Sequence, residues 1–155
     1  MSFRISGLAG GEFAGLCGLS DVELAARNAC RVVADRHPGF PCRVSLVDAQ
    51  PGESVLLVNY EHLPVTSPYR SRYAIYVREN ASEAQLRVNE IPQVLQHRLL
   101  SLRAFSAAGM LLDADVVEGA ALVPALERLL GPLEVAYLHV HNARPGCFAA
   151  RVDRA

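Results

Sequence analysis

The clearest hydrophobic pattern lies over residues 21–36. Ser20 and Glu23 have the spacing of a helix N-cap and its capping-box partner, and Leu19 and Leu24 have that of a hydrophobic staple. Apolar residues then recur at helical spacing until Pro38 and Gly39 interrupt the pattern: Val22, Ala26, Ala29 and Val33. We therefore expect a helix over residues 21–36 that packs its apolar stripe on a sheet.

Most of the remaining apolar segments have the length and pattern of strands. We expect strands at 42–47 and 54–61 joined as a hairpin, a strand at 73–78, a short helix near Pro92, a second hairpin from 99–105 and 110–117, a helix at 121–130, and closing strands at 134–141 and 147–153. This order predicts an α+β fold, in which an antiparallel-rich or mixed sheet carries two main helices. The length of 155 residues is typical of one domain, so residues 1–155 are expected to form a single unit.

Charge and composition limit the kinds of cofactor and ligand that this chain can bind. All 15 basic residues are arginine, and the chain has no lysine. A pyridoxal phosphate Schiff base and a phosphate-loop (P-loop) nucleotide site both require a lysine amine, so neither is expected. Arginine instead favours planar recognition of carboxylate or phosphate groups. The expected partner is therefore a small anionic molecule.

The sequence gives no sign of a macromolecular partner. The net charge is −1 and the arginines form no block, so we expect neither nucleic-acid nor membrane binding. The first residues do not resemble a signal peptide, and Cys17, Cys30, Cys42 and Cys147 contain no C-x-x-C pair. We expect a cytoplasmic protein with four free thiols, and the pattern leaves a homo-oligomer open.

Two histidines share one face of a closing strand. Side chains alternate along a strand, so His139 and His141 lie on one face, about 6.5–7 Å apart, while Leu138 and Val140 lie on the other. They suggest a divalent-metal site completed by either Cys147 or His62, because catalytic zinc uses three protein ligands and an open position. The alternative is a structural histidine pair hydrogen-bonded at a strand end.

Known histidine patterns are incomplete here. A histidine-triad nucleotide hydrolase would have a third histidine at position 143, which is Ala143, and the cupin pattern would require a glutamate shortly after His141, which is missing. Cys147 follows Pro145-Gly146 and is close in sequence to both histidines, so it is a candidate nucleophile. The candidate catalytic residues are His139, His141 and Cys147, and the alternative for Cys147 is a buried packing role.

Two predicted strands become polar where they end, at 59–62 and 139–142. If these ends meet, the loops that follow them bring polar side chains to one rim and form one pocket. The candidate ligand-binding residues are His62, Tyr69, Arg70, Asn142 and Arg144. We therefore expect a site for a small anionic or carbonyl-type molecule that is either enzymatic or, alternatively, a non-catalytic binding or assembly module with a structural polar cluster.

Four segments resemble a bacterial family described as domain of unknown function 1203: Gly39-Phe40-Pro41-Cys42-Arg43-Val44-Ser45-Leu46, Asn59-Tyr60-Glu61-His62, Pro68-Tyr69-Arg70 and His139 to Cys147. The resemblance extends over nearly the whole chain. It implies a stand-alone bacterial protein of about this length. It implies no activity, cofactor or catalytic residue.

Overall fold

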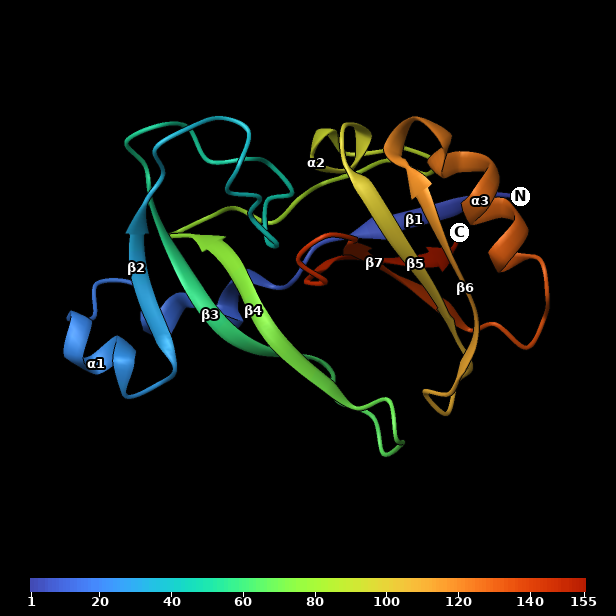
Figure 1. Cartoon of the computed structure of the whole chain (residues 1–155), viewed down its shortest axis with the longest axis horizontal. Helices are drawn as coiled ribbons and strands as arrows, with labels where there is room; N and C mark the ends of the chain where they lie inside the picture. Colours follow the sequence, from blue (N-terminus) through green and yellow to red (C-terminus); the bar gives the residue numbers. More distant parts are fainter.

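The computed structural model describes residues 1–155 and contains two antiparallel sheets, which lie side by side (Figure 1). The five-stranded sheet has the order β1 (Phe3–Ser6), β8 (Phe148–Arg154), β7 (Tyr137–Asn142), β5 (Leu99–Phe105) and β6 (Leu111–Glu118). The three-stranded sheet has the order β2 (Ala29–Val33), β3 (Ser54–Leu63) and β4 (Ser71–Arg78). Every pairing between these strands is antiparallel. The expected antiparallel α+β character is confirmed, with two sheets in place of one.

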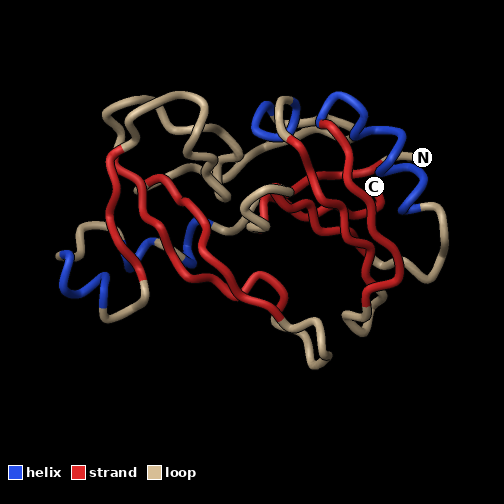
Figure 2. Tube along the Cα trace, viewed as in Figure 1, coloured by secondary structure: helices blue, strands red, loops and turns tan.

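Helices are short and lie at the periphery of the sheets (Figure 2). They are α1 (Asp21–Ala25), α2 (Gln93–Gln96) and α3 (Leu122–Leu130), with single 3-10 turns at Gly10–Glu12, Ala14–Leu16 and Gly119–Ala121. The predictions of a short helix after Pro92 and a helix at 121–130 are confirmed. No helix has both the length and the apolar character needed to cross a bilayer.

The predicted helix over residues 21–36 is wrong beyond its first turn. The capping box at Ser20 and Glu23 is present, but α1 ends after Ala25, and Asn28 adopts a left-handed backbone with φ 53°. Ala29–Val33 then pairs as an edge strand with β3. The apolar spacing that suggested a helix therefore belongs to one helical turn followed by a strand.

The predicted strand at 42–47 and its hairpin are also wrong. This segment contains only isolated bridges, from Pro41 to Asp48 and from Cys42 to Tyr76, around a turn in which Leu46 has φ 53°. The partners of β3 are instead β2 and β4. The turn buries the Arg43 side chain, which is only 2% exposed.

The two faces of the five-stranded sheet differ in chemistry. One face is apolar and packs against α3, which lies on the side of this sheet away from the three-stranded sheet (Figure 1). Leu100, Leu102, Leu138 and Val140 on this face are all fully buried. The opposite face carries the polar and aromatic residues of the same strands. The predicted hairpin of β5 and β6 and the closing strands β7 and β8 are confirmed.

Candidate functional site

The strand β7 places His139 and His141 on the same face, as alternation predicted. Both are buried, with exposed fractions of 3% and 1%. On the neighbouring strand β5, Arg103 pairs with His139 and Ser101 pairs with His141. Because directly paired residues point to the same side of a sheet, Arg103 belongs to the histidine-bearing face.

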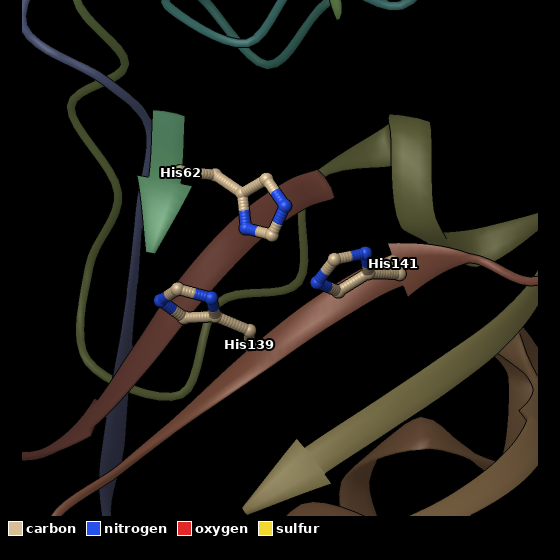
Figure 3. Close-up of side chains that lie close together, drawn as sticks. All are labelled: His62, His139 and His141. Atoms are coloured by element: carbon tan, nitrogen blue, oxygen red, sulfur yellow. The ribbon is translucent and has the colours of Figure 1, made fainter. Parts of the chain in front are cut away.

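His62 reaches the same place from the other sheet. Its ring centroid lies 6.0 Å from that of His139 and 5.0 Å from that of His141. Figure 3 shows the three rings directed toward one another, with His62 coming from the end of β3. The two strand ends therefore meet, which is the condition that the pocket hypothesis required.

Local irregularities in the ladders accompany two of the histidines. The β3–β4 register shifts between Tyr60 and Leu63, the segment that contains His62. The β7–β8 register shifts between Val140 and His141. A bulge changes the direction of a side chain and ends regular pairing, and such bulges are frequent beside active sites. These two shifts orient His62 and His141 at the junction of the sheets.

Each of the three rings has one potential ligand nitrogen that lies close to those of the other two. The three nitrogen atoms all lie within 4.8 Å of one another. His141 Nδ1 lies 2.9 Å from the carbonyl oxygen of Gly146, so this nitrogen carries the proton and donates, which leaves Nε2 with its lone pair. Nδ1 of His62, Nδ1 of His139 and Nε2 of His141 are buried without a hydrogen-bond partner. Three buried imidazole nitrogens therefore lack the partners that buried polar atoms normally have.

The surroundings keep these rings neutral. Burial lowers the pKa of His62 to about 4, with a further contribution from the Arg103 guanidinium. Burial also lowers the pKa of His139 and of His141 to about 3 each, and neighbouring positive groups add to both shifts. Neutral imidazole is the form that binds metal ions, so protons do not compete for these nitrogens at pH 7.

Aromatic side chains enclose the histidines. The Phe148 ring stacks on His62 at a centroid distance of 5.6 Å and meets His139 edge-on at 4.9 Å. Phe105 and Tyr137 contact His139 from the other side, at 5.5 and 5.4 Å. These contacts bury the histidine rings among aromatic side chains.

A cavity of about 250 Å³ opens beside the cluster. His62 and His141 line it together with Tyr69, Ser71 and Arg103, and the remaining wall is apolar: Leu63, Phe105 and Leu111. Arg103 contacts only Ser101 Oγ, at 3.5 Å, and pairs with no carboxylate. The cavity therefore offers one unpaired cation beside two of the three histidines.

A comparison with protein families identifies the family of this chain. The family model described as protein of unknown function (DUF1203) matches residues 39–154. The chain belongs to this family. All three clustered histidines lie inside the matched segment of this DUF1203 protein. No curated protein and no solved structure gives a significant match.

The prediction of a single pocket is wrong for this DUF1203 protein. Asn142, Arg144 and Cys147 line a second cavity of about 690 Å³, whereas Tyr69 lines the small one with His62 and His141. Arg70 lines neither cavity and pairs with Glu61 at the surface. Asn142 follows His141 directly in β7 and pairs with Leu100, so alternation directs its side chain to the face opposite the histidines.

Cys147 is not among the clustered ligands. Its sulfur lies 2.9 Å from Arg43 Nη2 and 3.5 Å from Asn142 Nδ2. The third potential ligand beside His139 and His141 is therefore His62 and not Cys147. All four cysteines are free in the structure. The candidate site residues chosen from the sequence did not include Arg103 or Arg43. Alternation along β5 would have placed Arg103 on the histidine face once the pairing of β5 with β7 was known, but nothing in the sequence indicates that Arg43 is buried.

Proposed function

We propose that His62, His139 and His141 bind one divalent metal ion of the zinc type, and that a small anionic or carbonyl-type molecule in the 250 Å³ cavity takes the open position on that ion. The observation that carries this proposal is the convergence of three unpartnered, buried imidazole nitrogens from two sheets. A set of three histidine nitrogens is a known donor set of catalytic zinc, which keeps a fourth position open.

The cluster needs only a small contraction to bind a metal. Nitrogen ligands 2.0–2.1 Å from a tetrahedral zinc are separated from one another by about 3.3 Å. The 4.8 Å limit of the present arrangement requires the rings to approach by about 1.5 Å at most, a change within reach of side-chain rotation. The bond from His141 Nδ1 to the Gly146 carbonyl is the kind of outer contact that orients a metal-bound imidazole.

The cavity defines the kind of molecule that fits. Its volume of about 250 Å³ is below the usual range for drug-sized ligands, which supports a compound of few atoms. Arg103 supplies a cation for a carboxylate or for negative charge that develops on a carbonyl oxygen. His62, His139 and His141 would hold the ion, which would supply an acidified water near neutral pH that could add to a carbonyl carbon. Hydration or hydrolysis of a small carbonyl compound is the reaction class that this geometry supports.

Titration of the metal-free protein with Co²⁺ tests the proposal. We expect one ion per chain and the visible absorption of tetrahedral cobalt, with no sulfur-to-metal charge-transfer band because Cys147 is not a ligand. Replacing His62→Ala or His139→Ala should lower the affinity at least about tenfold. His37→Ala, which removes an exposed histidine outside the cluster, should bind like the wild type.

Azide added to the cobalt protein tests the open position. We expect the visible spectrum to change as the anion replaces bound water, and Arg103→Met should weaken this change about tenfold without loss of the metal. Arg87→Met, at an exposed arginine outside the cavity, is the matched control. Absence of stoichiometric metal, or equal binding by the histidine variants, would contradict the proposal and support the non-catalytic alternative.

A further inference from the structure

The second cavity has an unusual arrangement at its base, a buried guanidinium without a carboxylate. Arg43 Nε donates to the carbonyl oxygen of Phe148 at 2.6 Å, and Nη1 donates to that of Pro41 at 2.6 Å. Nη2 points to Cys147 Sγ at 2.9 Å. Both carbonyl groups are neutral, so the sulfur is the only group bonded to Arg43 that can carry a negative charge.

A buried cation without a counter-ion is strongly unfavourable. Burial lowers the pKa of Arg43, and the neighbouring Cys147 sulfur opposes that shift. A cationic neighbour at hydrogen-bond distance favours the thiolate form of a cysteine, which is the nucleophilic form. Asn142 Nδ2, at 3.5 Å, adds a second donor to the same sulfur. Cys147 is therefore the hydrogen-bonded neighbour of Arg43 that can supply a counter-charge.

We propose that Cys147 acts as a nucleophile through its thiolate form and that the 690 Å³ cavity binds a small carbonyl compound carrying a carboxylate, with which this thiolate forms a reversible adduct. The sulfur adds to the carbonyl carbon, the π electron pair moves to the carbonyl oxygen, and that oxygen takes one proton from water. Nothing is oxidised or reduced in this step, and no further reactant is needed.

An independent observation at the same cavity indicates a ligand. Asn142 is only 7% exposed, it lines this cavity, and its Oδ1 has no hydrogen-bond partner. Buried side-chain oxygens are normally paired, so this acceptor is available to a donor group on a bound molecule. The protonated oxygen of the adduct described above is such a donor.

The arginines of this cavity differ in their availability. Arg98 is already paired with Asp48, at 2.7 Å from Nη2 to Oδ1. Arg144 is exposed at the rim and belongs to none of the ion pairs of the chain. Arg144 is therefore the group expected to hold the carboxylate of the ligand.

Alkylation with two matched reagents tests the inference. Iodoacetate and iodoacetamide react through the same carbon, where the S–C bond forms and iodide leaves with its electron pair, but only iodoacetate carries a carboxylate. On the chelated, metal-free protein at pH 6, we expect iodoacetate to modify Cys147 at least about tenfold faster than the exposed Cys30, as measured by peptide mass spectrometry. Iodoacetate should also react faster than iodoacetamide at Cys147, and not at Cys30.

Two variants test the carboxylate-binding role of Arg144 and the nucleophilic role of Cys147 separately. Arg144→Gln should remove the preference for iodoacetate while Cys147 stays reactive toward iodoacetamide, and Cys147→Ser should remove the fast phase. The inference is overturned if Cys147 reacts no faster than Cys30 in the folded protein, and its carboxylate component is overturned if Arg144→Gln leaves the preference unchanged. Arg87→Met, at an exposed arginine outside this cavity, should retain the fast phase.

Discussion

Unpaired buried polar atoms gather at the two cavities. Five buried side-chain atoms lack a hydrogen-bond partner, and four of them belong to His62, His139, His141 and Asn142. Each such atom costs about 1–3 kcal/mol relative to a paired one. This cost is concentrated where the chain has space for a ligand, as is common at functional sites.

Arg43 shows how strongly one residue can affect stability. Arg43→Met keeps much of the side-chain volume but leaves the carbonyl oxygens of Phe148 and Pro41 without their donor. We expect the free energy of unfolding to fall by about 3–5 kcal/mol. Urea denaturation monitored by circular dichroism measures this loss. The exposed control Arg144→Ala should stay within about 0.5 kcal/mol of the wild type, and a similarly small effect for Arg43→Met would contradict the structural role argued here.

At the residue scale, the sequence predicted the shared face of His139 and His141 but not the positions of Arg43 and Arg103. A strict alternation places His139 and His141 on one face in any strand, so their shared direction needs no tertiary information. The burial of Arg43 depends on a turn near Leu46 and on the position of Phe148, more than 100 residues away. A sequence pattern contains no record of such a long-range contact.

At the scale of elements, the predictions were wrong where a short apolar segment is compatible with either a helix or a strand. Residues 29–33 contain β-branched and small apolar side chains that are compatible with a helix stripe or with a strand. The choice is made by pairing with β3 and by the left-handed backbone of Asn28, a residue type that tolerates this conformation. Elements with clear end signals, such as α3 before Gly131 and Pro132, were predicted well.

Because α1 is short, we expect two of its apolar residues, Val22 and Leu24, to differ in their contribution to stability. Val22 is 81% exposed and Leu24 is fully buried, whereas the predicted long helix would bury Val22 in the apolar stripe that faces the sheet. We expect Val22→Glu to change the free energy of unfolding by less than about 0.5 kcal/mol. Leu24→Ala should cost about 2–4 kcal/mol because it leaves a cavity in the core. Chemical denaturation of both variants checks this, and a large loss in Val22→Glu would indicate the longer helix.

On the scale of the whole molecule, the histidine cluster joins the two sheets. His62 belongs to the three-stranded sheet, while His139 and His141 belong to the five-stranded sheet. The polar ends of two strands indicated one shared pocket on the condition that these segments meet. They did not predict two cavities, because the direction of the loop after Asn142 depends on the left-handed Gly146 and on the bond from its carbonyl to His141.

Because the histidines at this junction are buried, we expect the stability of the protein to fall as the pH falls. The pKa values of His139 and His141 are about 3 in the folded chain, below the ordinary value of about 6.5 that applies when the chain is unfolded. Between these values the unfolded chain binds more protons, so stability is fully present above about pH 6.5 and is lost as the pH falls toward 3. At pH 5 the loss is about 2 kcal/mol for each of these two histidines, and it is smaller for the less buried His62.

Unfolding by urea at pH 7, 6 and 5 measures this dependence. We expect the wild type to lose about 4–6 kcal/mol between pH 7 and pH 5, and His139→Leu to lose about 2 kcal/mol less because one buried imidazole no longer takes up a proton on unfolding. His37→Leu, at an exposed histidine, should keep the wild-type profile. Zn²⁺ added at pH 7 should stabilise the wild type more than His139→Leu, because the ion binds the folded cluster preferentially. A wild-type stability that stays constant from pH 7 to pH 5 would show that the three imidazoles are not held neutral at the junction, and the metal site would lose its electrostatic basis.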